Sequence, residues 1–172
     1  MRIVFLARSL NHGGAERQLV ALAKGLYQRN HKISVMTFYG GGPLEGDLNK
    51  AGIDVYTLDK QGRWDITRFI KKLYRLIKVE RPDILHSYLV VPNIITAIMR
   101  PLLPKIRIVW GVRASNVDFS LYDWSTRLTF KLSCTLSSLA DLIIINSQSG
   151  FVFHQDKGYP AHKMVVIPNG ID

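Results

Sequence analysis

The sequence predicts an α/β protein with a Rossmann-like, doubly wound parallel sheet of about seven strands and helices on both faces. Short apolar runs alternate with longer stretches of helical periodicity along the whole chain. The apolar runs are uniformly hydrophobic, which is typical of strands buried on both faces of a parallel sheet. With 172 residues, 47% of them hydrophobic, the chain is long enough for one folded domain with a sizeable core.

Each expected strand is a short run of apolar and β-branched residues. These runs lie at residues 3–7, 32–39, 53–58, 83–87, 106–112, 142–146 and 164–167. Between them, apolar residues recur at spacings of three and four, as on one face of a helix. The expected helices cover residues 15–29, 44–51, 66–80, 94–102, 122–139 and 149–157. Gly52 stops the second helix, Pro82 ends the third, and Pro101 closes or kinks the fourth.

Composition narrows the function classes. The net charge of +10 favours an anionic partner, which could be nucleic acid, acidic lipid or a phosphorylated substrate. The single Cys134 excludes an intrachain disulfide framework and a Cys-rich zinc site. The apolar runs are too short for a signal peptide or a membrane-spanning helix, so a cytoplasmic protein is expected.

Ligands of open parallel sheets bind beyond the carboxyl ends of the strands, which selects five loops before any motif is considered. These loops are rich in Gly, Asn, Ser, His and Arg, residue types that donate hydrogen bonds or bind phosphate. The candidate substrate-binding residues in them are His12, Gly13, Gly14, Glu16, His86, Tyr88, Asn93, Arg113, Ser115, Asn116, Ser147, Asn169 and Gly170.

Two of these loops leave alternatives open. Gly13 and Gly14 precede a helix, where backbone N–H groups can hold an anion, but the pair also suits a plain strand-to-helix turn. Arg113 ends an apolar strand and can bind a phosphate or carboxylate through two hydrogen bonds. Its alternative is a salt bridge to Asp118 or Asp123.

The histidines differ in expected role. His86 ends a strand at the ligand-facing edge, where either ligand contact or burial in the core is compatible with the sequence. His31 opens a strand on the opposite side and is interpreted as structural. His154 and His162 are interpreted as surface residues.

Over half of the net charge falls on residues 60–81, which carry a net charge of +6. Such a basic face is either simply solvated or docks on anionic lipid headgroups. The cations opposite the apolar stripe of the expected helix, and next to it, are Arg68, Lys71, Lys72, Arg75 and Lys78. Aromatic residues between positions 119 and 124 form a second candidate surface.

The sequence lacks the motifs that are typical of several classes of enzyme and binding site. The loop that follows the first expected strand has neither Gly-x-Gly-x-x-Gly nor Gly-Lys-Ser/Thr, which disfavours a nicotinamide or P-loop nucleotide site. Asp-x-Asp, His-Glu-x-x-His and Gly-x-Ser-x-Gly are also missing, so no metal site and no serine nucleophile are expected. The basic and aromatic residues do not interleave as in RNA-binding motifs, so no nucleic acid partner is expected.

Four segments in order resemble the retaining GT-B glycosyltransferases of family 4, the group 1 glycosyltransferases. Residues 2–5 followed by Gly-Gly-Ala-Glu-Arg at 13–17 are similar to the family's opening strand and loop. Residues 30–35 resemble its second strand, and Pro-Asp-Ile-Leu-His-Ser at 82–87 resembles its "PDIxHxH" strand. Residues 165–172 resemble the "VIPNGVD" segment that closes the N-terminal half.

The resemblance implies that residues 1–172 form the N-terminal, acceptor-side domain of a two-domain enzyme, with the donor-binding C-terminal domain absent. The implied reaction transfers a sugar from a nucleotide-sugar donor to a sugar or lipid-linked acceptor with retention, in polysaccharide or lipopolysaccharide synthesis at the inner face of the membrane. No metal or other cofactor is implied, and the fragment alone is expected to be inactive. Arg113 stands where many members carry His, and Tyr88 where a second His often occurs. A non-catalytic binding module for anionic membranes and a nucleotide-sugar epimerase on the same fold are the alternatives.

Overall fold

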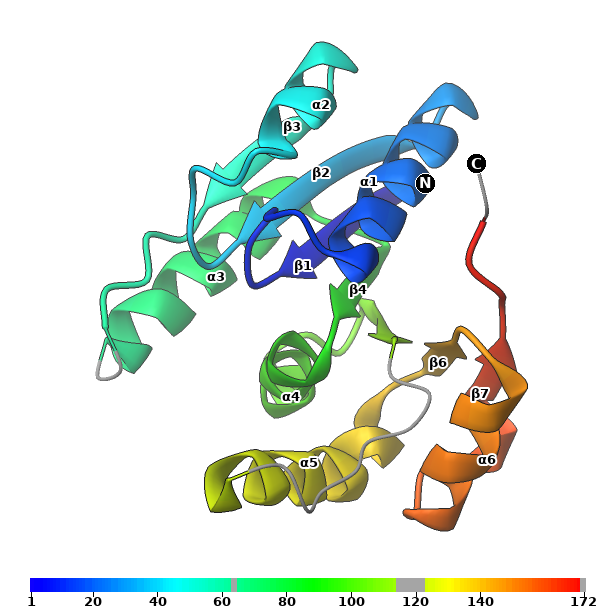
Figure 1. Ribbon diagram of the computed structural model, residues 1–172. Helices are drawn as coiled ribbons and strands as arrows, with labels where there is room; N and C mark the ends of the chain where they lie inside the picture. Colours follow the sequence, from blue (N-terminus) through cyan, green and yellow to red (C-terminus); the bar gives the residue numbers. More distant parts are fainter. Residues whose placement is uncertain (63–64, 114–122, 171–172) are drawn as a thin grey trace. The chain divides into compact units, whose positions relative to one another are not determined.

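A seven-stranded sheet of order β3-β2-β1-β4-β5-β6-β7 confirms the predicted doubly wound α/β fold. The computed structural model describes residues 1–62, 65–113 and 123–170 (Figure 1). The strands are β1 (Arg2–Ala7), β2 (Lys32–Thr37), β3 (Asp54–Thr57), β4 (Ile84–Tyr88), β5 (Arg107–Val112), β6 (Leu142–Ile145) and β7 (Met164–Val166). The strand order reverses between β1 and β4, which is the switch point where such sheets bind ligands.

The helices follow the predicted sequence of elements. They are α1 (Gly14–Gln28), α2 (Glu45–Lys50), α3 (Ile66–Glu80), α4 (Val90–Ile98), α5 (Trp124–Leu136) and α6 (Gln148–Asp156). Short 3₁₀ turns follow α4 and α5 and precede β7. Contacts within the chain define two compact units, Met1–His86 and Ser87–Asp172, and the boundary between them falls inside β4.

In the first unit, β2 pairs in parallel with both β1 and β3. Phe5 and Leu6 of β1 are fully buried, as expected for a central strand. The apolar stripe of α3 is buried through Phe69, Leu73 and Ile77, at spacings of four. The ring of Phe69 meets that of Phe38 edge to face, with ring centroids 4.8 Å apart, which fixes this helix against the core.

In the second unit, β6 pairs in parallel with β5 and β7. The core of this unit is centred on Trp110 of β5, whose side chain is fully buried. Its indole N–H donates to Thr96 Oγ1 at 3.2 Å, and its ring lies 6.2 Å from that of Tyr159. The one polar atom of the indole is therefore satisfied, which allows the large side chain to be buried.

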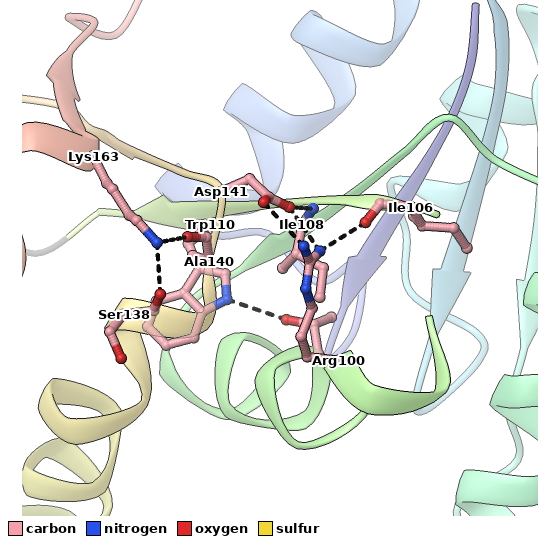
Figure 2. A network of polar contacts seen from close by, with 9 residues as sticks. Arg100, Ile106, Ile108, Trp110, Ser138, Ala140, Asp141 and Lys163 are labelled. Carbon is pink, nitrogen blue, oxygen red and sulfur yellow. Dashed lines mark hydrogen bonds and ion pairs between the residues drawn. The ribbon is translucent and has the colours of Figure 1, made fainter. Parts of the chain in front are cut away.

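A polar network holds the amino ends of β5 and β6 together (Figure 2). The carboxylate of Asp141 accepts two hydrogen bonds from the guanidinium of Arg100, at 2.8 and 3.2 Å. It also accepts the backbone N–H of Ile108 at 2.7 Å. Lys163 donates to the carbonyl oxygens of Ser138, in the 3₁₀ turn after α5, and of Ala140, just after that turn. The side chain of Asp141, which directly precedes β6, is thus bonded both to the start of β5 and to the turn after α4.

We expect Asp141→Ala to lower the free energy of unfolding by about 1–2 kcal/mol, because it leaves a backbone N–H and a guanidinium without their hydrogen-bond acceptor. The ion pair is about one-third exposed (29% for Arg100 and 35% for Asp141), so solvent screens part of the charge term. Urea denaturation measures the loss. The exposed Asp156→Ala is the matched control and is expected to change stability by less than about 0.5 kcal/mol. Equal losses in both variants would contradict the role of the network.

The fourth helix begins and ends four residues before the predicted positions 94 and 102. Leu89 has φ 70° and ψ 171°, a backbone conformation that is otherwise nearly restricted to glycine. Its N–H donates to the Gly111 carbonyl at 3.0 Å, and the helix starts at the next residue. Pro92 is accommodated because it lies in the first turn, where its missing N–H has no helical partner to lose. Pro101 lies in the 3₁₀ turn that follows, in line with the predicted closure.

The prediction that His154 is a surface residue is wrong, whereas His162 is exposed as predicted. His154 is 2% exposed and is enclosed by the rings of Phe130, Phe153 and Tyr159. Its Nδ1 is 2.8 Å from the carbonyl oxygen of Gly150, one helical turn earlier. The imidazole therefore packs in the buried face of α6 as an aromatic residue would.

We expect stability to fall as the pH drops below about 6.5, the usual pKa of histidine. Burial lowers the pKa of His154, and the hydrogen bond to Gly150 opposes this only in part. The folded state therefore resists protonation, while the unfolded state takes up the proton, so acid favours unfolding. Thermal unfolding measured between pH 7 and pH 5 tests this. The slope should flatten in His154→Phe and stay unchanged in His162→Phe.

Candidate functional site

The loop after β1 brings together four predicted residues of the first unit. Gly13 is the N-cap of α1, and Gly14 is its first residue. The carboxylate of Glu16 reaches back and occupies the space that a Cβ on Gly13 would need, whereas the space beside Gly14 is open. Glu16 stands at the third helical position, where its negative charge faces the positive end of the helix dipole. His12 is exposed at the edge of the loop.

A glycine that was not predicted to matter supports this loop. An added Cβ on Gly42 would lie 2.5 Å from the carbonyl carbon of Leu10. The Leu10 carbonyl oxygen also accepts the N–H of Leu44 at 3.1 Å. The Gly-Gly-Gly-Pro stretch at 40–43 indicated a loop, but no pattern in the sequence indicated which backbone it approaches.

His86, the last residue of the first unit, lies on β4 and is 4% exposed. Its ring lies 5.2 Å from that of Phe5, at an interplanar angle of 35°. This placement agrees with the core alternative for the residue, and a part in ligand binding stays a prediction.

In the second unit, the structure joins three predicted residues into one cluster. Arg113 follows β5, Tyr88 ends β4, and Asn169 lies beyond β7. The guanidinium of Arg113 donates to the hydroxyl of Tyr88 at 3.1 Å and to Oδ1 of Asn169, and it lies 5.2 Å from the centre of the Tyr88 ring. We call these three residues the Arg113 cluster. The sequence predicted each residue but not their contact.

The electrostatics of the Arg113 cluster suit an anion. Burial raises the pKa of the Tyr88 hydroxyl, and the adjacent positive charge of Arg113 opposes the rise. Within the described ranges, Arg113 forms no ion pair with a carboxylate, and its buried Nε has no hydrogen-bond partner. Asp123, one of the two alternatives for a salt bridge, instead caps α5 by accepting the N–H of Thr126 at 3.1 Å. Asp118 lies outside the described residues.

Asn93 is 2% exposed, and its contacts are with the protein. Its Oδ1 accepts from the hydroxyl of Ser87 at 2.7 Å, and its Nδ2 donates to the Gly111 carbonyl at 3.4 Å. Asn93 therefore ties the start of α4 to β5, two residues before Arg113. The hydroxyl of Ser87 also lies 3.2 Å from Thr96 Oγ1, which extends the network to the acceptor of the Trp110 indole.

Two strand ends carry buried polar atoms that the sequence reasoning did not single out. Thr37 Oγ1 ends β2, and Asn146 Oδ1 follows β6; neither atom has a hydrogen-bond partner within the described part of the chain. Asn146 ends the expected strand 142–146, and a polar residue at the end of an apolar run was its available signal. Thr37 lies inside the expected strand 32–39, where no such signal exists. The neighbouring Ser147 caps α6 by accepting the N–H of Gly150 at 3.1 Å. Gly170 is exposed, while Ser115 and Asn116 lie outside the described residues.

Helix α3 carries the five cations of the predicted basic surface. Arg68, Lys71, Arg75 and Lys78 are exposed on α3. Lys72 is partly neutralised, because its ammonium pairs with Asp59. A hydrogen bond from Lys72 lowers the pKa of the Asp59 carboxyl. Binding of these cations to an anionic surface stays a prediction.

A cavity of about 340 Å³ opens at the amino ends of β1 and β2, on the side opposite the loops considered above. Its polar groups partly satisfy one another: the hydroxyl of Ser34 donates to the carboxylate of Glu80 at 3.1 Å. The carboxyl ends of the strands remain the better candidate, because the unsatisfied buried atoms lie there.

Among the described residues, no group of three or more His, Cys, Asp or Glu side chains is placed to hold a metal ion. None of the described helices combines the length and apolar character that crossing a membrane requires.

Comparison with known proteins gives a family match over nearly the whole chain. Residues 12–172 match the family described as Glycosyltransferase Family 4. Over 99 residues the chain is 32% identical to GalNAc-alpha-(1->4)-GalNAc-alpha-(1->3)-diNAcBac-PP-undecaprenol alpha-1,4-N-acetyl-D-galactosaminyltransferase of Campylobacter jejuni. That match covers 55% of this chain and 27% of the relative.

Two solved structures show the same fold. Anabaena Alr3699/HepE in complex with UDP-glucose has a TM-score of 0.82 at 23% identity, over 100% of this chain and 44% of that chain. The UDP-GlcNAc 2-epimerase from Methanocaldococcus jannaschii has a TM-score of 0.66 at 12% identity, over 98% of this chain and 46% of that chain. The chain thus spans less than half the length of either solved protein.

Proposed function

Because the chain belongs to Glycosyltransferase Family 4, we propose that it is the acceptor-side domain of a GT-B enzyme. This enzyme transfers a sugar from a nucleotide-sugar donor to an acceptor hydroxyl with retention at the anomeric carbon. The proposal rests on the Arg113 cluster, which lies at the edge of the sheet where ligands bind. Among the described residues, the guanidinium of Arg113 has no carboxylate partner. The donor is held by a second domain beyond this chain.

The reaction breaks the bond between the anomeric carbon and a phosphate oxygen of the donor and forms a bond to the acceptor oxygen. Negative charge develops on the leaving diphosphate, and fixed positive groups lower the barrier by stabilising it. In this chain, Arg113 is held by two side-chain contacts and can offer its remaining N–H groups to an anionic group of the acceptor. The open backbone at Gly14 gives a substrate close access to the start of α1.

Two observations support a lipid-linked acceptor: the name of one relative and the positive charge of this chain. The name of the Campylobacter jejuni enzyme specifies a glycan joined through a diphosphate to undecaprenol. A lipid diphosphate of this kind suits both a guanidinium at the site and a basic protein surface. We propose a lipid-linked glycan of cell-surface polysaccharide or lipopolysaccharide synthesis as acceptor, at the cytoplasmic face of the membrane. No metal or other cofactor is required in this proposal.

A second candidate function is electrostatic binding to an anionic membrane through α3. Its support is the row of exposed cations Arg68, Lys71, Arg75 and Lys78, spaced to share one side of the helix. Each basic residue near an anionic surface contributes about 1 kcal/mol. This binding is compatible with transfer to a lipid-linked acceptor and does not depend on it.

An NMR titration of the 172-residue chain tests the proposal. A short-chain polyprenyl diphosphate carrying N-acetylgalactosamine should shift the amide signals of Tyr88, Arg113 and Asn169. UDP-N-acetylgalactosamine at the same concentration should leave them in place, and the chain alone should transfer no sugar. Sugar transfer by the chain alone, or binding of the UDP-sugar without the lipid diphosphate, would contradict the acceptor-side assignment.

The epimerase alternative has a direct assay. An epimerase converts UDP-GlcNAc into its C2 epimer without any acceptor, whereas the proposed transferase needs an acceptor hydroxyl. Formation of the epimer by the complete enzyme, with no acceptor present, would replace the proposed activity by epimerisation.

A further inference from the structure

The cavity of about 340 Å³ at the amino ends of β1 and β2 lies within the first unit, and we call it the amino-edge cavity. The strand register builds its floor, because Arg2 pairs with Lys32, and Ser34 pairs with Asp54. Paired residues, and every second residue along a strand, point to the same face of a sheet. The end of α3 covers this face, where the Glu80 carboxylate accepts the hydroxyl of Ser34 at 3.1 Å. Small-molecule sites occupy roughly 300–1,000 Å³, so the space is large enough for a small ligand.

Two positive side chains stand next to each other in this cavity. The register places Arg2 and Lys32 side by side on neighbouring strands, where their like charges repel. Within residues 1–62, 65–113 and 123–170, neither side chain forms an ion pair. The nearby carboxylate of Asp83 instead accepts the backbone N–H of Arg2 at 2.8 Å. The two cations therefore have room for an anionic group that comes from outside the chain.

A second cavity, of about 430 Å³, borders the same two cations. Arg2 and Lys32 line both cavities, so the two spaces are neighbours. Arg81, the residue that ends α3, adds a third positive side chain to the second cavity, and Asp83 is the one carboxylate in its lining. The second cavity is thus the more positive of the two. A guanidinium presents a planar set of donors that matches a carboxylate, so an anionic group fits best on this side.

The far side of the amino-edge cavity is negative. Glu80 is held in place by the buried hydroxyl of Ser34, and burial together with a hydrogen bond to Glu80 raises the pKa of the Tyr56 hydroxyl. Asp54 supplies a second carboxylate to the lining. In the part of the chain that the structure describes, neither carboxylate forms an ion pair. Helix α3 ends at Glu80, and the negative end of its dipole favours a cation there.

Opposite charges around one space select a ligand that carries both signs. A simple anion is repelled by Glu80 and Asp54, and a simple amine is repelled by Arg2 and Lys32. A small molecule with one ammonium and one carboxylate group meets a partner at each end. The charges on this part of the surface therefore discriminate against ligands that carry only one of the two groups.

We propose that the amino-edge cavity and the second cavity together bind a small zwitterion of the amino acid class. Its carboxylate lies among Arg2, Lys32 and Arg81, and its ammonium group lies at Glu80 and Asp54. The site is at the other end of β1 from the glycine loop at residues 13–14. It is a separate site from the one proposed for sugar transfer, and it holds whether or not the chain takes part in that reaction.

An NMR titration of the 172-residue chain tests the site. Glycine, β-alanine, 4-aminobutanoate and 6-aminohexanoate carry the same two charges at increasing separation. One of them should fit best and should shift the amide signals of Lys32, Ser34, Asp54 and Glu80 until saturation. The amine and the carboxylate of the same chain length, for example butylamine and butanoate, should bind about tenfold more weakly, because each lacks one set of hydrogen bonds to a charged group.

Two outcomes of this titration would overturn the proposal. Equal affinity for the amine or for the carboxylate alone would show a site for a single charge. The absence of a saturable shift with all four amino acids would show that the cations and carboxylates of the chain neutralise one another in solution.

Charge-removing variants locate the site. Lys32→Gln and Glu80→Gln each delete one charge, and a glutamine at position 80 still accepts the hydroxyl of Ser34. Each variant should weaken binding of the best amino acid about tenfold. Lys50→Gln and Asp47→Asn are the matched controls, because they make the same kinds of change at exposed positions of α2 that line neither cavity, and they should bind like the parent chain. Thermal unfolding verifies that all four variants fold, and unchanged affinity in either Lys32→Gln or Glu80→Gln would overturn the proposal.

Discussion

Replacing Trp110 by alanine is expected to lower the free energy of unfolding by about 3–5 kcal/mol, the usual cost of truncating a buried tryptophan. The side chain is fully enclosed by the core of the second unit, so its removal leaves a cavity among residues that already pack against one another. It also removes the indole N–H from Thr96 Oγ1 and the edge contact with Tyr159. A typical domain has only about 5–15 kcal/mol in total, so the second unit should be close to unfolding.

Urea denaturation followed by circular dichroism measures this loss. Trp124→Ala is the matched control, because it truncates the same side chain at a position that is 76% exposed. Its effect should stay within about 0.5 kcal/mol, the usual range for surface substitutions. Trp110→Phe should retain part of the stability, since a phenyl ring fills much of the volume without the N–H. Similar losses at positions 110 and 124 would refute the assignment of Trp110 as the centre of the core.

Arg113→Ala is expected to weaken binding of an anionic acceptor about a hundredfold, the effect of removing a charged donor aimed at developing or fixed negative charge. Arg113 follows β5 directly, and its contacts with Tyr88 and Asn169 hold the guanidinium in one place. Lysine lacks the planar, forked set of donors, so Arg113→Lys should recover only a small part of the affinity. Tyr88→Phe should have a smaller effect, because the ring still lies against the guanidinium.

Isothermal titration calorimetry with the short-chain polyprenyl diphosphate that carries N-acetylgalactosamine measures this affinity. Arg107→Ala serves as the control, because it removes an exposed arginine from the other end of the same strand. Equal affinities for Arg113→Ala and the parent chain would remove the Arg113 cluster from the proposed site. A general loss caused by unfolding would show in the thermal transition, which we expect to be unchanged in Arg113→Ala.

The regular elements could be predicted because their information is local. Uniformly apolar runs such as residues 3–7 have few options other than a buried parallel strand, and the stripe at 66–80 fixes a helix and its inner face. The start of α4 could not be predicted, because it depends on the left-handed backbone of Leu89, which is held by a carbonyl on another strand. The burial of His154 escaped prediction because its aromatic neighbours are assembled only by tertiary packing.

The candidate site was predictable as a set of loops but not as a set of contacts. The rule that ligands bind beyond strand ends selected Tyr88, Arg113 and Asn169 separately. Their hydrogen bonds join segments up to 56 residues apart, a separation at which sequence spacing carries no geometric information. Asn93 shows the opposite outcome: it lies in a selected loop, yet its side chain is occupied within the fold.

The carboxylate of Glu16 over the N-cap of α1 makes it a tethered competitor for whatever anion approaches that helix end. Because it is covalently attached, its effective concentration at the start of the helix is on the order of millimolar or higher. We expect a singly charged ligand below that concentration to be kept out, whereas a diphosphate brings more charge and more acceptor atoms to the N–H groups at the start of the helix. A comparison of diphosphate with chloride and acetate as ligands of this loop should therefore favour the diphosphate.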